Sequence, residues 1–201
     1  MTGFIKEQGI IAPMLANNID TDVIMPKQFL KGIDRKGLDR GVFFDQRFLA
    51  NGERNPDFVL NQAPWSSAKF LATGSNFGCG SSREHAVWGL KQLGIRAIIG
   101  TSFGGIFFDN CQRNGLLVIE LSDEQMQYFS EQVVRSDLGQ IDIDLPEQSI
   151  TVGEQCLAFE IEALRKNALL SGLDAIGSTL QRKDAITQFE RKHLQANPWL
   201  A

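Results

Sequence analysis

The segment Lys69-Phe-Leu-Ala-Thr-Gly-Ser-Asn-Phe-Gly-Cys-Gly-Ser-Ser-Arg-Glu-His-Ala86 joins two elements of different periodicity. Residues 69–72 form an apolar run of strand length, and after the glycines the apolar residues recur at helical spacing, at Ala86, Val87, Leu90 and Leu93. Gly94 ends the helical pattern, and residues 96–100 form a second apolar run. The order strand, glycine-rich loop, helix, strand predicts an α/β fold.

The same alternation extends to both sides of this segment. Strands are expected near residues 4–5, 10–13 and 116–121, and a hairpin at 141–145 and 149–152. Helices are expected at residues 122–134, where Ser122 and Gln125 make a capping pattern, and near 163–170 and 184–195. Residues 32–52 are irregular and rich in Phe and charge, which is typical of a loop that closes over something. No repeat or linker divides the 201 residues, so we expect one domain, with a C-terminal helical extension from about residue 163.

The end of the glycine-rich segment is suited to binding an anion. Ser81 to Arg83 fall at the N-terminus of the expected helix, where unpaired N–H groups and the helix dipole favour a carboxylate or phosphate. Arg83 adds a permanent planar cation. Ser81-Ser-Arg-Glu84 also spells a capping box, which is a purely structural alternative. A cap has no need of Gly74, Gly78 and Gly80, whereas close approach of backbone to a ligand does, so the glycines favour a site.

Composition excludes several classes of protein. With 43% hydrophobic and 22% charged residues the chain can bury a core, and a net charge of −4 argues against nucleic-acid binding. Residues 1–15 resemble neither a secretory signal nor a membrane span, so a cytoplasmic location is expected. The cysteines are odd in number and widely spaced, which predicts neither a disulfide framework nor a metal site within this chain: Cys79, Cys111 and Cys156.

Two further motifs accompany the glycine-rich segment. Asn18-Ile-Asp-Thr-Asp22-Val-Ile-Met-Pro26 precedes it, and Phe107-Phe-Asp-Asn-Cys-Gln-Arg-Asn-Gly115 follows it. Together with a Phe-rich stretch at 29–48 and Gly172-Leu-Asp-Ala-Ile-Gly-Ser-Thr-Leu180, they cover most of the chain. This ordered set resembles the small, swivel-type subunit of the aconitase superfamily. The resemblance implies a compact swivelling β/β/α domain with additional C-terminal helices.

The resemblance also implies a chemistry and a partner. Members of the superfamily dehydrate and rehydrate hydroxy acids with a 4Fe-4S cluster, which in two-subunit members is held by three cysteines of a separate large subunit. This chain is then expected to bind no cofactor or metal itself, to be inert alone, and to form a heterodimer or heterotetramer with the large subunit. The length and the stretch Phe29-Leu-Lys-Gly-Ile-Asp-Arg-Lys-Gly37 are most similar to members that act on isopropylmalate.

Site residues are carried over by position. The first serine of the motif acts as a base in its alkoxide form in this superfamily, and the arginine two residues later binds a substrate carboxylate, which implies Ser81 as catalytic and Arg83 as substrate-binding. Ser82 and Gly80 are expected beside the substrate. In the Asp-Thr-Asp element the resemblance implies a catalytic Asp22 and, beside it, a substrate-binding Thr21. An Asx-type turn is the structural alternative for residues 20–22.

Residues 28–37 are expected to choose the substrate, with Leu30 offering apolar surface and Lys31 charge. A mobile surface loop that packs only against the partner is the alternative. For Asn110, Asn114, Glu84 and His85 we expect turn, capping or structural roles. Two other functions stay open: a subunit acting on homoaconitate or on methyl-substituted malate or maleate, and a non-catalytic module that binds a phosphate.

Overall fold

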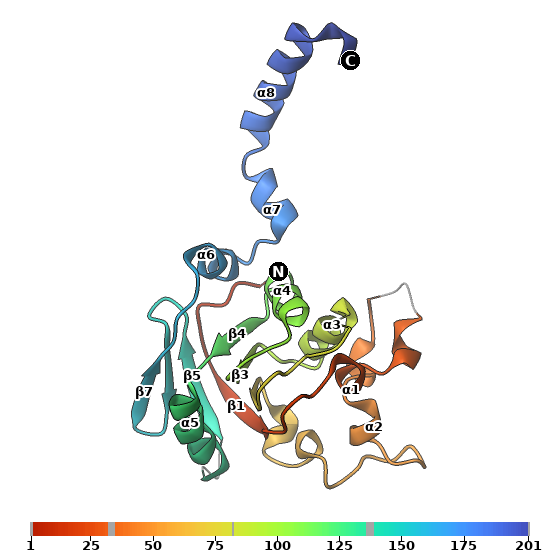
Figure 1. The fold of residues 1–201 in the computed structure, drawn as a ribbon, viewed down its shortest axis with the longest axis vertical. Helices are drawn as coiled ribbons and strands as arrows, with labels where there is room; N and C mark the ends of the chain where they lie inside the picture. The colour runs from red at the N-terminus through yellow and green to blue at the C-terminus, as the bar shows by residue number, and fades with distance from the viewer. Residues whose placement is uncertain (1, 32–34, 82, 136–138, 201) are drawn as a thin grey trace.

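The computed structural model describes residues 2–31, 35–81, 83–135 and 139–200 (Figure 1). In this part of the chain seven strands form one sheet in the order β4-β3-β2-β1-β5-β6-β7. The strands β1 to β4 are parallel, and β5 to β7 continue the sheet antiparallel from the other side of β1. The strands are β1 (Lys6–Met14), β2 (Phe70–Thr73), β3 (Ala97–Gly100), β4 (Leu117–Glu120), β5 (Gln140–Asp144), β6 (Ser149–Val152) and β7 (Gln155–Ala158).

Helices connect the parallel strands and cover the sheet. The α-helices are α1 (Thr21–Ile24), α2 (Phe44–Arg47), α3 (Glu84–Gln92), α4 (Gly105–Arg113), α5 (Asp123–Arg135), α6 (Ala163–Ser171), α7 (Ala175–Leu180) and α8 (Lys183–Ala196). Short 3-10 helices are η1 (Lys27–Leu30), η2 (Leu38–Arg40), η3 (Val59–Asn61), η4 (Trp65–Ser67) and η5 (Pro198–Leu200). The α/β class expected from the alternation of elements is confirmed.

The parallel strands are buried on both faces because successive side chains enter different cores. Along β2, Leu71 packs with α3 and α4, whereas Phe70 and Ala72 pack with α5. The same alternation holds for β3, where Ile98 lies between Ala97 and Ile99. Two cores on one sheet explain why these strands read as continuous apolar runs in the sequence rather than as an alternating pattern.

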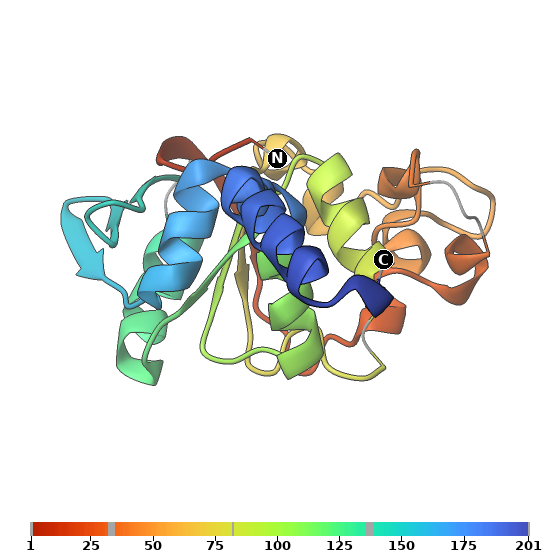
Figure 2. The ribbon, with the colours of Figure 1, turned by 90° about the horizontal axis from the view of Figure 1, so that it is seen from above.

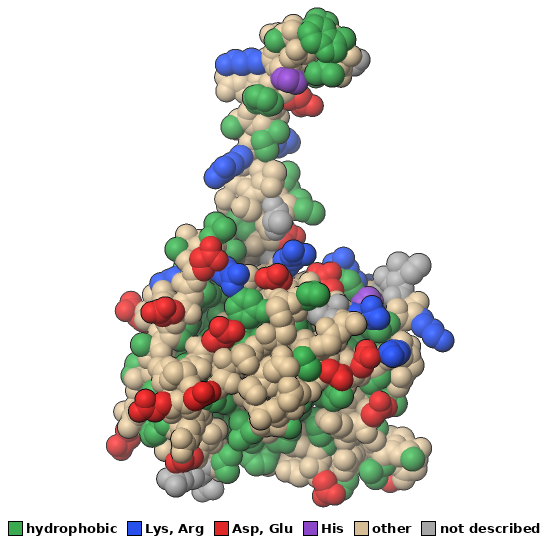
Figure 3. Space-filling view, in the orientation of Figure 1, with side chains coloured by type: hydrophobic (Ala, Val, Ile, Leu, Met, Phe, Trp, Pro, Cys, Tyr) green, Lys and Arg blue, Asp and Glu red, His purple; other side chains and the backbone are tan. Residues whose placement is uncertain are grey.

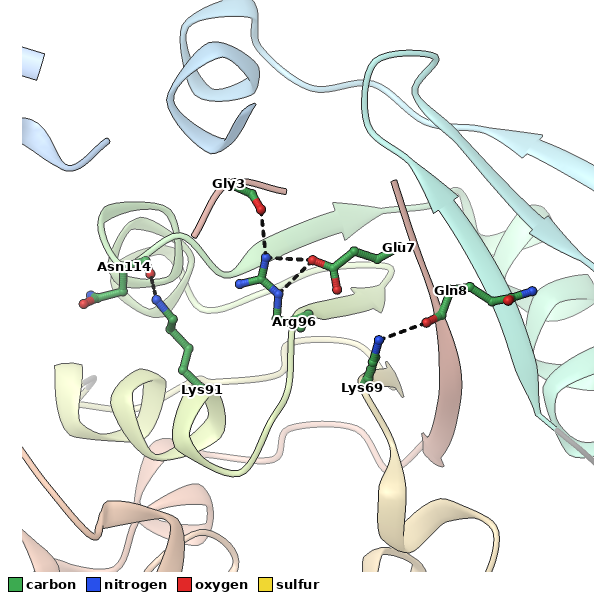
Figure 4. Close-up of polar contacts among 7 residues, drawn as sticks. All are labelled: Gly3, Glu7, Gln8, Lys69, Lys91, Arg96 and Asn114. Atoms are coloured by element: carbon green, nitrogen blue, oxygen red, sulfur yellow. Dashed lines mark hydrogen bonds and ion pairs between the residues drawn. The ribbon is translucent and has the colours of Figure 1, made fainter. Parts of the chain in front are cut away.

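A half-buried ion pair links β1 to the start of β3 (Figure 4). The guanidinium of Arg96, at the start of β3, donates to Oε1 of Glu7 at 2.7 and 2.9 Å and to the carbonyl oxygen of Gly3 at 3.2 Å. Nearby, Lys69 Nζ donates to the carbonyl oxygen of Gln8 at 3.2 Å. The fork of Arg96 satisfies two acceptors at once, which fixes β1 against its parallel neighbours.

The sequence predicted most of these elements, but it missed some. The strands β2, β3 and β4, the hairpin of β5 and β6, and the helices α3, α5, α6 and α8 are confirmed within two residues or so. At residues 20–22 the chain starts a short helix, α1, and the Asp20 side chain caps it. Within residues 35–52, part of the stretch that we expected to be an irregular loop, η2 and α2 form, and Leu38, Val42 and Phe43 are buried in the core. The strand β7 and the helices α1, α2, α4 and α7 were not predicted, and the strand expected near residues 4–5 lies before β1, which begins at Lys6.

The end of the chain leaves the body of the molecule. Figures 1 and 2 show α7 and α8 rising as an arm from α6, which lies on the body. We call residues 175–200 the C-terminal arm. The helix α8, all of whose residues are described, has no buried residue. Within the described residues no helix has both the length and the apolar content to cross a membrane.

Candidate active site

The first two motifs meet at the carboxyl ends of β1 and β2. Because β1 and β2 are parallel neighbours, the loops that follow them leave the same edge of the sheet. Backbone hydrogen bonds join these loops: Asn18 N donates to the oxygen of Ser75 at 2.9 Å, and Gly78 N to that of Ile19 at 2.7 Å. The chain then brings Thr21 N within 3.0 Å of the oxygen of Cys79. Two segments that lie about 60 residues apart in the sequence thus form one rigid surface.

The third motif, residues 107–115, and the loop before it pack against this surface. Phe77 N donates to the oxygen of Ser102, in the loop after β3, at 3.2 Å, and Gly104 N donates to the oxygen of Phe77 at 2.9 Å. The rings of Phe77 and Phe107 pack edge to face with their centroids 5.5 Å apart. Phe107 lies in the first turn of α4, so the helix of the third motif holds up the glycine loop, residues 74–83.

The three glycines of the loop, Gly74, Gly78 and Gly80, have different structural roles. A Cβ at Gly78, whose φ is +75°, would lie 2.2 Å from the ring of Phe107, and one at Gly74 would lie 2.5 Å from the oxygen of Ala16. These two glycines therefore permit close packing within the protein, and the expectation that they admit a ligand was wrong. Gly80 differs, because it is exposed, has φ of +85°, and a Cβ there would make only ordinary contacts, the nearest 3.6 Å from the Cβ of Asp20. Of the three, Gly80 alone retains the predicted place beside a ligand.

The helix after the glycine loop begins later than a capping box requires. The N-cap of α3 is Arg83, and its side chain makes no capping hydrogen bond to the described residues. Ser81 and Arg83 are both exposed. Ser82, predicted to bind substrate, lies outside the described residues. The capping box expected from Ser81 and Glu84 is therefore wrong, and the Ser81 hydroxyl is placed on the surface ahead of the first turn of α3.

The carboxylate of Glu84 has a different partner. Asn114, the C-cap of α4, donates from Nδ2 to Oε1 of Glu84 at 2.7 Å and accepts the indole N–H of Trp88 at 2.9 Å. Lys91 Nζ donates to its carbonyl oxygen, and burial lowers the pKa of Lys91. Asn114 is thus the capping residue that we expected, but it also ties α3 to α4. This link could not be predicted from local sequence patterns, because the partners are 23 to 30 residues apart.

The three residues of the Asp-Thr-Asp element, residues 20–22, differ in burial and in their contacts. Asp20 accepts the N–H of Val23 at 2.8 Å and caps α1, which confirms the structural interpretation for this residue. Thr21 is only 3% exposed and lies beneath Gly80. Asp22 is exposed, and its carboxylate lies 3.5 Å from Lys27 Nζ. Of the three, Asp22 is the most exposed, since Asp20 is half-buried and Thr21 is buried.

The expected substrate loop is fixed at its ends. Leu30, at the end of η1, is half-buried and packs on the core, whereas Lys31 is exposed. Residues 32–34 lie outside the described part. At the far end the guanidinium of Arg35 lies 4.1 Å from the centre of the Trp88 ring, a favourable cation–π distance. The loop is therefore attached to α3, the helix that starts after Arg83.

The described residues do not assemble a metal centre. Among them, no three His, Cys, Asp or Glu side chains come close enough to hold a metal ion. Cys111 is fully buried in α4, and burial raises the pKa of its thiol well above the usual value. Cys79 is half-buried within the glycine loop, and Cys156 is exposed on β7. The exposed groups of the candidate site are therefore hydroxyl, guanidinium, carboxylate and ammonium.

Comparison with known proteins gives two family matches. Residues 1–124 match the aconitase C-terminal domain, and residues 176–201 match the C-terminal domain of the 3-isopropylmalate dehydratase small subunit. The second match covers nearly the whole C-terminal arm.

Curated relatives match along the entire chain. The 3-isopropylmalate dehydratase small subunit 1 of Mannheimia succiniciproducens is 59% identical over 189 residues, 94% of each chain. Small subunit 2 of Salmonella typhimurium is 54% identical over 200 residues, covering 100% of this chain and 96% of its own length. A crystal structure of 3-isopropylmalate dehydratase from Methanocaldococcus jannaschii superposes with a TM-score of 0.69 over 92% of this chain and 99% of its own, at 24% identity, which bears on the fold alone.

Proposed function

Because this chain belongs to the family of 3-isopropylmalate dehydratase small subunits, within the aconitase C-terminal domain family, we propose that it is the small subunit of a 3-isopropylmalate dehydratase. This hydro-lyase interconverts 2-isopropylmalate and 3-isopropylmalate by dehydration and rehydration, a step of leucine biosynthesis. The observation that carries the proposal is the 54–59% identity with named small subunits over at least 94% of their length. We also propose that the chain acts in the cytoplasm and that its residues 1–201 form one swivel domain.

The reaction needs groups of the kind exposed at the candidate site. A proton must leave the carbon next to a carboxylate, and the hydroxyl must leave the neighbouring carbon. We assign proton removal to Ser81, because the N–H groups at the start of α3 and the charge of Arg83 favour an alkoxide there. We assign a substrate carboxylate to Arg83, whose planar fork can donate two parallel hydrogen bonds. Ser82 is assigned a second hydroxyl contact.

The other predicted residues take supporting roles. Asp22 stays a catalytic candidate because it is exposed on the segment joined to the glycine loop. The burial of Thr21 under Gly80 argues for positioning rather than substrate contact, so we change that assignment. Lys31 keeps its proposed contact with the substrate. Leu30 offers only its exposed part to the isopropyl group, since the rest packs on the core.

The candidate site is half of an active site in this proposal. Ser81 and Arg83 lie on an exposed surface and need a second surface to exclude water from the reaction. We propose that the large subunit provides that surface and a 4Fe-4S cluster, which would act as the Lewis acid that takes the hydroxyl. Among the described residues of this chain, no three His, Cys, Asp or Glu side chains are placed to hold a metal ion, so we assign the cluster ligands to the large subunit.

Reconstitution under anaerobic conditions tests the proposal. The chain is mixed with cluster-loaded large subunit from the same source, and dehydration of 3-isopropylmalate is followed, with each protein omitted in turn as the control. We expect turnover only in the mixture. Parallel assays with homoaconitate and with methyl-substituted malate distinguish the substrates. A complex with an intact cluster could turn over homoaconitate or methyl-substituted malate but not 3-isopropylmalate. That result would keep the superfamily chemistry and show that the isopropylmalate assignment is wrong.

A further inference from the structure

The C-terminal arm carries more exposed apolar surface than a free chain normally tolerates. Six large apolar side chains of the arm are between 46% and 76% exposed: Ile176, Leu180, Ile186, Phe189, Trp199 and Leu200. On α8, Ile186, Phe189 and His193 recur at helical spacing and form a row, and the rings of Phe189 and His193 stack with centroids 5.5 Å apart. Such a row on a helix that buries nothing marks a surface for a partner.

The root of the arm is held firmly on the body. Arg165 of α6 lies 4.9 Å from the centre of the Phe108 ring of α4, and the oxygen of Leu169 accepts the N–H of Phe4 at 3.0 Å. Gly172, at φ of +64°, ends α6, and Asp174 then caps α7. The arm is therefore a projecting continuation of a docked helix, and its direction is set by contacts on the body.

The arm and the candidate site lie on connected surface. A hollow of about 510 Å³ at the root of the arm is lined by α6, α7 and the last turn of α4, including Arg113. The next residue, Asn114, bonds to Glu84, which follows Arg83 directly. In Figure 3, Lys and Arg side chains gather at the end of the body from which the arm rises. A partner that covers the candidate site therefore reaches the root of the arm without a break.

We propose that the C-terminal arm is a docking element for the large subunit, seated in an apolar groove whose rim is acidic. This inference rests on the proposed function, which requires a large subunit at the adjoining site. The arm matches a family model specific to small subunits of this enzyme, whereas the aconitase C-terminal domain match ends at residue 124. The acidic rim follows from the charges of residues 182–193, where four basic residues (Arg182, Lys183, Arg191 and Lys192) outnumber two acidic ones (Asp184 and Glu190).

Phe189 is the point at which the proposal is tested, because buried aromatic anchors dominate such interfaces. Phe189→Glu places a charge on the apolar row, and Gln188→Glu adds the same charge to the neighbouring exposed position, which points away from it. Affinity for the purified, cluster-loaded large subunit is measured by calorimetry. We expect Phe189→Glu to weaken binding at least tenfold and Gln188→Glu to change it less than twofold. Thermal unfolding of both isolated variants should match the parent, since α8 buries nothing.

Two further measurements keep the outcome clear. A chain ending at Arg182 should lose affinity by at least as much as Phe189→Glu. Sedimentation of the isolated chain tests a second copy as the occupant: self-association that Phe189→Glu abolishes, with large-subunit affinity unchanged, would overturn the proposal. Equal affinities of parent and Phe189→Glu would also overturn it. Because binding is measured without substrate, a failure of isopropylmalate turnover leaves this test intact and counts against the substrate assignment alone.

Discussion

Two segments of this chain follow the same capping pattern and fold differently. At Ser122-Asp-Glu-Gln125 the box forms: Gln125 N donates to Ser122 Oγ at 3.2 Å, and Ser122 N donates to Gln125 Oε1 at 3.0 Å. At Ser81-Ser-Arg-Glu84 the helix starts at Glu84 instead, with Arg83 as its N-cap. Both segments have the serine and the Glu or Gln that a capping box requires, so we attribute the difference to the residues that surround them.

At Ser81 to Glu84, neighbouring residues prevent the capping box from forming. Asn114 holds the carboxylate that would complete the box, and Gly80 turns the chain with φ of +85° just before Ser81. The hydroxyl of Ser81 and the guanidinium of Arg83 are left exposed as a result. Where a local rule fails in this way, a functional site is the usual reason, whereas the segment at Ser122 serves only to start α5.

Ser81→Ala should have the largest effect of the variants in these two segments, and the effect should be on turnover. If Ser81 is the base, turnover by the reconstituted enzyme should fall by about 10²- to 10⁴-fold, the usual contribution of such a group. Unfolding in urea should stay within about 0.5 kcal/mol of the parent, because the residue is exposed and caps no helix. Activity within a few-fold of the parent would remove Ser81 from the mechanism.

Arg83→Lys tests whether the guanidinium of Arg83, the N-cap residue of α3, binds a substrate carboxylate. A point charge cannot reproduce the two parallel hydrogen bonds of the guanidinium, so the KM for 3-isopropylmalate should rise roughly 10- to 100-fold. The matched control is Arg113→Lys, an exposed arginine at the end of α4, which should leave the KM unchanged. An unaltered KM for Arg83→Lys would show that this charge does not hold the substrate.

Asn114→Leu removes the competitor for Glu84. The variant leaves the indole N–H of Trp88 and the carboxylate of Glu84 without their observed partner, which should lower the free energy of unfolding by about 1–3 kcal/mol. We also expect a raised KM, because the start of α3 carries Arg83. The exposed neighbour Arg113, changed to Gln, is the control for stability. An equal loss of stability in both variants would refute a specific role for Asn114.

Ser122→Ala should have the smallest effect and only on stability. Loss of a capping hydroxyl costs about 1 kcal/mol, measurable as a lower urea midpoint with an unchanged slope. Turnover should equal that of the parent. A loss of turnover together with unchanged stability would reverse the assignment of the two segments.

The sequence predicted the parts of the molecule that depend on local pattern. Periodicity located β2, α3, β3 and β4, because both faces of these strands are apolar and the helices have one apolar stripe. It did not predict β7, an edge strand whose side chains are mostly exposed, or the six-residue α7. Local pattern carries little signal at such exposed, short elements.

The candidate site was predictable in its residues but not in its construction. The motifs drew attention to Ser81, Arg83 and Asp22, and the structure places all three on exposed surface. The roles of Gly74 and Gly78 as packing positions, and the bond from Asn114 to Glu84, depend on contacts between distant segments. No single stretch of sequence contains that information.

The central position of β1 has a consequence for biosynthesis. The strand is made first, yet Ile11 pairs with Phe70 on one side, and on the other side Ile10 pairs with Gln140. During translation the backbone N–H and C=O groups of β1 therefore stay unpaired until most of the chain has left the ribosome. Such unpaired strands are prone to aggregation. The loop after β1 supplies Asp22, so we expect the site to be completed late in folding, after β5 has closed the sheet.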